Sequence, residues 1–195
     1  MAKPVTHLDE AFPLERTRAR MLRVDHSGER GAVAVYSGQL LFSKLLDDKT
    51  VGFLQTARAH EIEHRAAFRE AMNERGVSPC ATGWLWIAGG FALGVLSVFG
   101  GRRGIMACTA AIERAVHGHL GDQIAYLEPR DPQLAAVLRR INVEEVEHMQ
   151  MGEAGYNPDC RSASLFTGFI SSITHALIFL STFGDSSRLG RAMQS

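Results

Sequence analysis

The sequence predicts an all-α protein built around a bundle of four helices. No stretch shows the alternation of apolar and polar residues that is typical of β-strands. A carboxylate and histidine pattern occurs twice: Glu29 precedes Glu61-x-x-His64 by 32 residues, and Glu113 precedes Glu145-x-x-His148 by the same interval. Helix breakers fall near the middle of both intervals, which indicates that each interval folds into a helical hairpin.

Breakers also set the bounds of the expected elements. Residues 1–16 are expected to form an irregular arm, because Pro4 and Pro13 interrupt regular structure. Gly76 suits the position that follows a helix, and the sequence EPRDP at 128–132 is a strong breaker. Four long helices are expected over 17–46, 49–75, 103–127 and 132–154. One or two further helices are expected within 162–193.

The breakers lie where hairpin geometry requires them. Glu113 lies 15 residues before Glu128, and Glu145 lies 13 residues after Pro132. With a rise of about 1.5 Å per residue, residues at such distances from a turn reach the same level of a hairpin. In the first interval, whose turn lies near Asp47, the two arms match to within about two helical turns.

The two hairpins are joined by a long connection that contains the uncharged apolar segment 83–101. Ferritin-like bundles need one long crossover for the second hairpin to pack correctly against the first. The sequence therefore predicts a ferritin-like four-helix bundle with a long apolar crossover and additional C-terminal helices, in one domain over 17–195.

The repeated pattern predicts a metal centre. Positions i and i+3 lie on one face of a helix, so both residues of each Glu-x-x-His motif can bind the same ion. Carboxylate oxygens with imidazole nitrogens suit iron or manganese better than structural zinc. We expect Glu61 and Glu145 to bridge two irons. The remaining ligands are expected to be Glu29 and His64 on one ion and Glu113 and His148 on the other.

Other polar residues near the motifs are less informative. Asp25 and Asn142 could each hydrogen-bond a ligand histidine or lie at the surface, and His119 could face the site or a substrate channel. Tyr36 is expected to be a packing residue. Several residues are expected at the surface because their helical phase differs from that of the ligands: His7, His26, His60, His117, Glu63, Glu144 and Glu147.

Composition excludes some classes of protein. The 195 residues carry 21 basic and 21 acidic side chains, so the basic surface of a nucleic-acid binder is not expected. Three cysteines without a C-x-x-C motif favour a reducing compartment. The first 20 residues resemble neither a secretory signal nor a mitochondrial transit peptide, so we expect a bacterial, cytoplasmic setting. The uncharged stretches 76–101 and 162–184 could span a membrane, lie in its interface or be buried in the bundle.

Longer motifs resemble a known family. The runs VDHSGERGAVAVYSGQL, HEIEHRAAF, WIAGGFALGVLSVFGGRRGIMACTAAIE and VEEVEHMQMG are similar to those of the demethoxyubiquinone hydroxylases of ubiquinone biosynthesis. The similarity covers about residues 20–190 and includes the six expected ligand positions. One departure is Arg30, which stands where the family often has a non-basic residue.

The resemblance implies a membrane-associated di-iron monooxygenase that hydroxylates a polyprenylated methoxy-methyl-benzoquinol with O2, with NADH as the expected reductant. It implies a peripheral location on the cytoplasmic side of the bacterial inner membrane. Partners could include other ubiquinone-biosynthesis proteins or a second copy of the chain. Candidates for an apolar substrate entrance are Trp84, Trp86, Phe91, Leu93 and residues 165–183, although these could equally pack in the core, as the Gly90-x-x-x-Gly94 pair suggests.

Three other functions remain open from the sequence. A ferritin-like iron-storage protein would share the ligands but not the long uncharged segments. A lipid-binding subunit would have no need of buried carboxylates, which cost free energy without partners. Another di-iron redox enzyme, such as a peroxidase or a tRNA hydroxylase, is disfavoured by the lack of a cysteine cluster and of a basic face.

Overall fold

The computed structural model describes residues 7–182 and 184–194. Within these ranges the chain is helical and forms no strand, which confirms the predicted all-α class. The helices are α1 (His7–Ala11), α2 (Leu14–Leu40), the 3-10 turn η1 (Ser43–Leu45), α3 (Asp48–Glu74), α4 (Gly83–Val98), α5 (Gly101–Leu127), α6 (Pro132–Ala154), α7 (Arg161–Thr182) and α8 (Asp185–Gln194).

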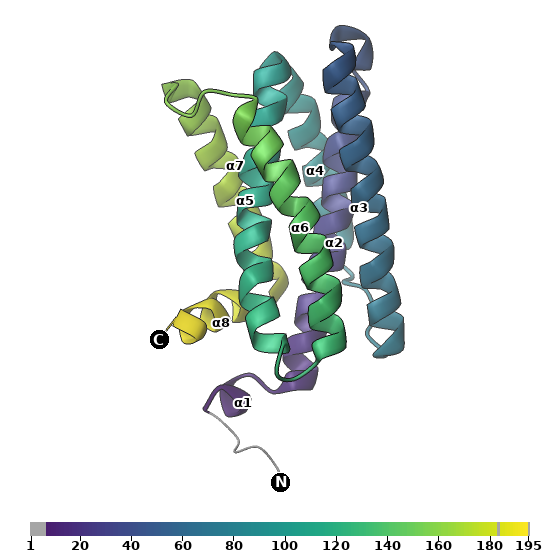
Figure 1. Cartoon of the computed structure of the whole chain (residues 1–195), viewed down its shortest axis with the longest axis vertical. Coiled ribbons are helices and arrows are strands. Elements are labelled where there is room, and N and C mark those ends of the chain that lie inside the picture. The colour runs from purple at the N-terminus through teal and green to yellow at the C-terminus, as the bar shows by residue number, and fades with distance from the viewer. Residues whose placement is uncertain (1–6, 183, 195) are drawn as a thin grey trace.

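The four long helices form two hairpins. Helix α2 packs on α3 and α5 packs on α6, and α3 and α6 meet across the bundle. Helices α4 and α7 both pack on α2 and α5, so they form an additional layer beside the bundle (Figure 1). The crossover between the hairpins is therefore mainly helix α4, as the long apolar connection predicted.

Side-chain caps fix where the second helix of each hairpin begins. Asp47 accepts a hydrogen bond from the backbone N–H of Thr50 at 2.9 Å, and Asp131 accepts one from Leu134 at 3.1 Å. These bonds satisfy N–H groups that lack a partner within the helix. At the other end of α3, Gly76 has a φ of +62°, a conformation that favours glycine after a helix, as the sequence predicted.

The N-terminal part of the chain differs from the expectation. Residues 1–6, including Pro4, lie outside the described residues, but the rest of the expected arm contains helix α1. Helix α2 begins directly after Pro13, three residues before the expected start. Pro13 is the N-cap: its carbonyl accepts the first bond of the helix from Thr17, and no N–H is needed at this position. The same helix ends at Leu40, and η1 occupies the last residues of the range that was expected to be helical.

Helix α4 lies unusually close to α2. A Cβ atom added at Gly90 would clash with the carbonyl oxygen of Gly31, and one added at Gly94 would clash with that of Val35. Gln39 on α2 also donates a hydrogen bond to Ser97 on α4 at 2.9 Å. The glycine pair therefore serves contact between two helices, one of the two interpretations that the sequence left open.

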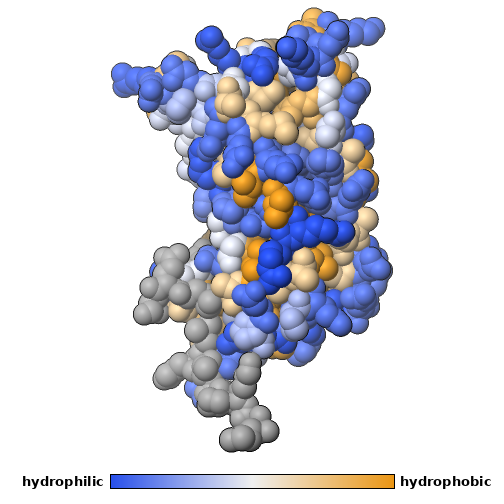
Figure 2. Space-filling model, viewed as in Figure 1, coloured by the Kyte–Doolittle hydropathy of each residue, from blue (hydrophilic) through white to orange (hydrophobic). Residues whose placement is uncertain are grey.

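The outer sides of α4 and α7 are apolar and exposed. Helix α7 contains a stretch, Ala163–Thr182, that is long and apolar enough to cross a membrane by length and composition, and only 17% of it is buried. Helix α4 has 16 residues, fewer than the about 20 that a span needs. By contrast, the face formed by α3 and α6 in front is mostly hydrophilic (Figure 2). The exposed apolar side chains on the two helices include Trp84, Phe91, Leu96, Leu165, Phe169, Phe179 and Leu180, and Phe99 directly after α4 is exposed as well.

Candidate metal centre

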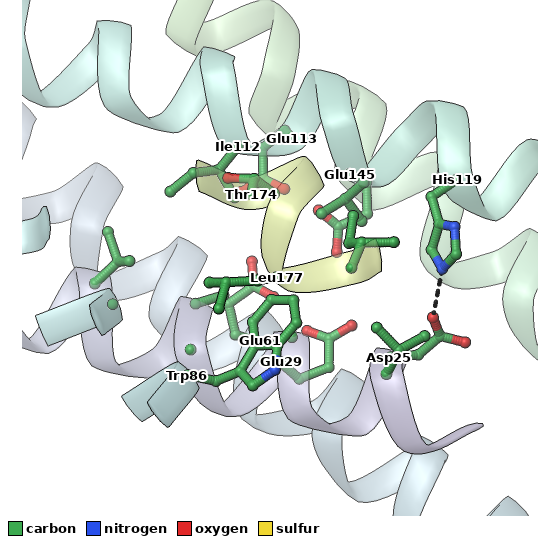
Figure 3. A pocket seen from close by; sticks show the side chains of 18 of the residues that line it. Asp25, Glu29, Glu61, Trp86, Ile112, Glu113, His119, Glu145, Thr174 and Leu177 are labelled. Atoms are coloured by element: carbon green, nitrogen blue, oxygen red, sulfur yellow. Dashed lines mark ion pairs between the residues drawn. The ribbon is translucent and has the colours of Figure 1, made fainter. Parts of the chain in front are cut away.

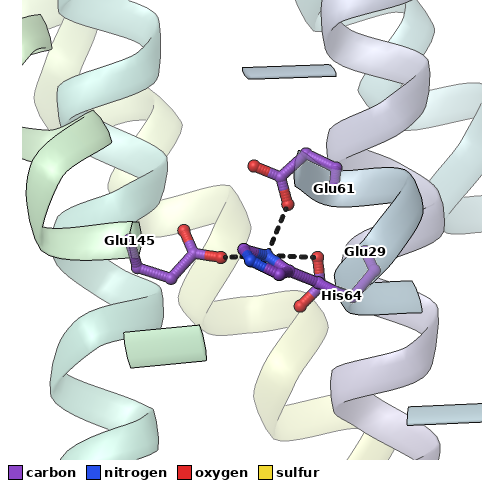
Figure 4. A group of neighbouring side chains, drawn as sticks. All are labelled: Glu29, Glu61, His64 and Glu145. Carbon is purple, nitrogen blue, oxygen red and sulfur yellow. Dashed lines mark ion pairs between the residues drawn. The ribbon is translucent and has the colours of Figure 1, made fainter. Parts of the chain in front are cut away.

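The six residues of the repeated pattern meet inside the bundle. Glu29 comes from α2, Glu61 and His64 from α3, Glu113 from α5, and Glu145 and His148 from α6. Each of them is at least 94% buried. Figure 4 shows Glu29, Glu61 and Glu145 pointing toward the ring of His64. The expected placement of both hairpins at one level is therefore observed.

The side chains form two overlapping groups. The first contains Glu29, Glu61, His64 and Glu145, and the second contains Glu61, Glu113, Glu145 and His148; in each group, one ligand atom per residue lies within 4.8 Å of the others. Glu61 and Glu145 belong to both groups. This is the arrangement expected if two carboxylates bridge two ions, each held additionally by one glutamate and one histidine.

Several oxygen and nitrogen atoms of the centre make no hydrogen bonds with one another and are free to bind metal ions. Four buried atoms make no hydrogen bond, namely Glu61 Oε1, His64 Nδ1, Glu145 Oε2 and His148 Nδ1. His64 Nδ1 lies 3.1 Å from Glu145 Oε1, and His148 Nδ1 lies 3.3 Å from Glu61 Oε1. Buried polar atoms without partners cost free energy. Cations between these atoms would remove that cost, so the residues fit a pair of metal ions.

Electrostatics point the same way. Burial raises the pKa of Glu29 and Glu113 well above the usual range, and the neighbouring carboxylates Glu61 and Glu145 raise it further. For Glu61, burial acts in the same direction, but contacts with His148 and His64 outweigh it and lower the pKa to about 2. Four carboxyl groups therefore compete for positive charge in a space closed to water, which two divalent cations would supply.

The outward nitrogen of each histidine also has a partner. His64 Nε2 lies 3.0 Å from Glu144 Oε2, and His148 Nε2 lies 3.1 Å from His60 Nδ1. Such partners orient a ligand histidine and fix which nitrogen carries the proton. Glu144 and His60 were expected at the surface; their side chains are 34% and 33% exposed, and the contacts with the two histidines were not expected. Each is half-buried between α3 and α6 and immediately precedes one of the two shared glutamates.

Tyr36 and Asn142 contact residues other than His64 and His148. The hydroxyl of Tyr36 donates a hydrogen bond to Glu113 Oε1 at 3.0 Å, so this residue does more than fill space. Asn142 accepts a hydrogen bond from His117 Nδ1 at 2.8 Å, so its partner is not one of the two histidines of the centre. His117, expected at the surface, is half-buried.

The remaining predicted positions divide into surface and interior. Glu63 and Glu147 are exposed as predicted, and the side chain of His7 lies outside what the structure describes. His26 is buried, contrary to the prediction, and burial together with the nearby charge of Arg30 lowers its pKa to about 4.

The two arginines that follow Glu29 and Glu113 in the sequence point elsewhere. Arg30 lies against Gly83 of α4, and exposed Arg114 pairs with Glu153. Neither arginine lines the cavity beside the metal centre.

A largely apolar cavity of about 70 Å³ adjoins the metal centre. Glu29, Glu61, Glu113 and Glu145 form part of its wall, and the rest comes from α2, α4, α5 and α7. Trp86 lies in this wall and donates a hydrogen bond from its indole nitrogen to Ser181 on α7 at 3.1 Å. The arrangement can hold two metal ions beside space for an apolar ligand.

Comparison with known proteins gives the family. The model of the family described as ubiquinone biosynthesis protein COQ7 matches residues 16–181, which include all six residues of the centre and the whole of α4. The chain belongs to this family. One member, the 3-demethoxyubiquinol 3-hydroxylase of Rhodospirillum rubrum, is 36% identical over 164 residues, which are 83% of this chain and 76% of the relative. The resemblance inferred from the motifs is confirmed.

Eukaryotic members of the COQ7 family are similar as well. The mitochondrial NADPH-dependent 3-demethoxyubiquinone 3-hydroxylase of Dictyostelium discoideum is 32% identical over 169 residues, covering 84% of this chain and 76% of the relative. The human protein of the same name is 36% identical over 138 residues, which are 68% of this chain and 62% of the human protein. The family thus includes both bacterial and mitochondrial enzymes.

Proposed function

We propose that this protein is a di-iron monooxygenase that hydroxylates the ring of a polyprenylated methoxy-methyl-benzoquinol in ubiquinone biosynthesis. The single observation that carries the proposal is the pair of overlapping groups, with Glu61 and Glu145 in both, beside an apolar cavity. The family and the names of its members supply the substrate class. An iron-storage protein would have no use for such a cavity.

The proposed ligands are the six residues of the repeated pattern. Glu29 and His64 would hold one iron, Glu113 and His148 the other, and Glu61 and Glu145 would bridge them. Two ferrous ions held there would supply two electrons and open coordination positions for O2, of which one oxygen atom would enter the ring and the other would leave as water. The protein supplies the rest: Glu144 and His60 orient the two histidines, and Tyr36 holds one oxygen of Glu113.

Water is kept from the reacting centre by the layer of α4 and α7. Trp86, Leu177 and Ile178 form an apolar wall on this side of the cavity. An aromatic ring bound there would meet the carboxylates without bulk solvent, which strengthens electrostatic interactions within the site. The electron source is proposed to be a nicotinamide nucleotide. NADH was the expectation, whereas the names of some relatives specify NADPH.

The exposed apolar sides of α4 and α7 support peripheral attachment to a membrane. A polyprenyl quinol resides in the bilayer, and these two helices separate the cavity from the surroundings. For this chain we propose the cytoplasmic side of a bacterial inner membrane. The same apolar surface could bind a second copy or another protein of the pathway.

Complementation tests the function. Bacteria that lack their own demethoxyubiquinol hydroxylase accumulate the demethoxy lipid, and this gene is expected to restore ubiquinone in extracted lipids. Glu145→Ala should fail to restore it, while Glu147→Ala, a change at an exposed position two residues away, should succeed. Persistent accumulation with the well-expressed, iron-loaded wild-type protein would contradict the proposal.

A further inference from the structure

One polar pair on the wall of the cavity is separate from the six residues of the metal centre. Asp25 on α2 and His119 on α5 face each other across one end of the cavity, with 3.5 Å between Asp25 Oδ1 and His119 Nε2. Figure 3 shows the pair together on one side of Glu29 and Glu145. Asp25 was expected either to contact a ligand histidine or to lie at the surface, and it does neither.

Gln123 holds this pair in place. Its amide nitrogen lies 2.8 Å from Asp25 Oδ1 and 2.7 Å from His119 Nε2, and an amide nitrogen has two hydrogens to donate. Gln123 is 1% exposed and lies one turn beyond His119 on α5. One oxygen of Asp25 is thereby fixed, and the direction of the other oxygen is fixed with it.

That other oxygen has no partner. Asp25 Oδ2 is buried and makes no hydrogen bond, and the same is true of Gln123 Oε1. A link between α2 and α5 with a purely structural purpose would be expected to satisfy these atoms, because leaving them unpaired costs free energy. An unpaired acceptor on a cavity wall instead matches a ligand that brings a hydroxyl group.

The distance to the metal centre suits an aromatic ring. Asp25 lies four residues before Glu29, so their positions on α2 are about 6 Å apart along the helix axis. This is the scale of one benzene ring with its substituents. The present cavity of about 70 Å³ is smaller than the about 150 Å³ of an engineered cavity that admits benzene. Binding must therefore displace part of the wall, which on one side consists of Leu177 and Ile178 of α7.

We propose that Asp25, held by Gln123 beside His119, binds a ring hydroxyl of the quinol and so sets which ring carbon faces the metal centre. The inference rests on the proposed function, because it assumes a quinol as ligand. The hydroxyl donates to Asp25 Oδ2, and the apolar remainder of the wall receives the ring and the start of its tail. Asp25 contacts the substrate directly, whereas Gln123 is a positioning residue.

A binding experiment without turnover tests this. The probes are a short-chain alkyl methoxy-methyl-benzoquinol and the matched compound that lacks both ring hydroxyls, titrated calorimetrically into the iron-loaded full chain without O2. Asp25→Asn should weaken quinol binding about tenfold or more, because a hydrogen bond to a charged acceptor is lost. Binding of the hydroxyl-free compound should change less than about twofold. Gln123→Met should give a smaller loss of the same selective kind.

The matched control is Gln39→Met. Gln39 is also a buried polar residue of α2 that bonds a neighbouring helix, but it does not line the cavity. This variant should bind both probes like the wild type. Equal weakening of both probes in Asp25→Asn, or unchanged quinol binding, would overturn the inference while leaving the proposed function intact. A wild-type protein that loads iron but binds neither probe would overturn the proposed function itself, and the inference with it.

Discussion

The imidazole ring of His60 stacks on that of His148, with 5.2 Å between the ring centroids and 3.1 Å between His60 Nδ1 and His148 Nε2. On the other histidine of the centre, Glu144 occupies the equivalent place at 3.0 Å. Each proposed ligand histidine is therefore held from outside by a residue of the facing helix. The two partners differ in charge, which makes the two halves of the centre unequal.

Glu144→Ala and His60→Ala should each lower metal affinity by roughly 10- to 100-fold, since the imidazole ring of the ligand histidine loses the hydrogen-bond partner that orients it. Competition with a chelator of known affinity measures this. Glu63→Ala and Glu147→Ala are matched controls on the same two helices, because both side chains are exposed. Variants of Glu144 and His60 that hold iron as tightly as these controls would show that the outer contacts are dispensable.

The close approach of α2 and α4 predicts opposite effects at two glycines of α4. Gly94→Ala places a methyl group against the carbonyl of Val35 and should cost about 1–3 kcal/mol of unfolding free energy. Gly89 has no atom within 4 Å of an added Cβ, so Gly89→Ala should be neutral or stabilising by up to about 1 kcal/mol. Urea unfolding of both variants measures the difference. Equal effects at the two positions would contradict the packing described for α4.

Asp131 should make stability depend on pH in the acid range. It accepts hydrogen bonds from Arg75 at 3.0 and 3.1 Å and from Arg18 at 2.9 Å, besides capping α6. The bonds from Arg75 hold its pKa at about 2, below the ordinary value of 3.8. Because the folded-state pKa is the lower one, the stabilisation is complete above about pH 4 and is lost as the pH falls toward 2.

Asp131→Asn should therefore be less stable than the wild type by about 2–3 kcal/mol at pH 7, through loss of the ion pairs and weakening of the cap. The difference should shrink as the pH approaches 2. Urea unfolding of both metal-free proteins across this range gives the comparison. A difference that stays constant down to pH 2 would mean that the carboxylate charge is not responsible.

The exposed face of α7 predicts membrane binding that depends on single side chains. Leu165→Glu or Leu180→Glu should reduce co-sedimentation with phosphatidylethanolamine–phosphatidylglycerol vesicles by about tenfold, because each leucine would lose its burial in lipid. Both leucines are 68% exposed. Val143→Glu is the control, since Val143 is 59% exposed on α6, away from α7. Equal losses at all three positions would point to general charge repulsion instead of an oriented surface.

Spacing along the chain predicted the bundle and the convergence of the six residues, because the level of a residue along a hairpin follows from its sequence distance to the turn. It could not predict the roles of His60 and Glu144. A residue one position before Glu145 is turned by about 100° around α6. Whether that direction faces water or α3 depends on how the two hairpins pack, which no sequence interval records.

The apolar crossover illustrates the same limit. Its composition is compatible with lipid contact or with core packing. In the structure, one side of α4 packs on α2 through Gly90 and Gly94, while Trp84 on α4 and Phe99 directly after it are exposed.

Asp25 was missed as a cavity residue for a related reason. Its partners, His119 and Gln123, lie more than 90 positions later and meet it only through the packing of α2 on α5.

Iron content per chain tests the central claim most directly. Purified protein loaded with ferrous iron should bind two irons per chain. Glu145→Ala should lose most of both, because Glu145 belongs to both groups, whereas Glu29→Ala should mainly weaken the ion shared with His64. Glu147→Ala should keep both irons. Full iron occupancy in Glu145→Ala, or a wild-type protein that binds no iron, would contradict the account.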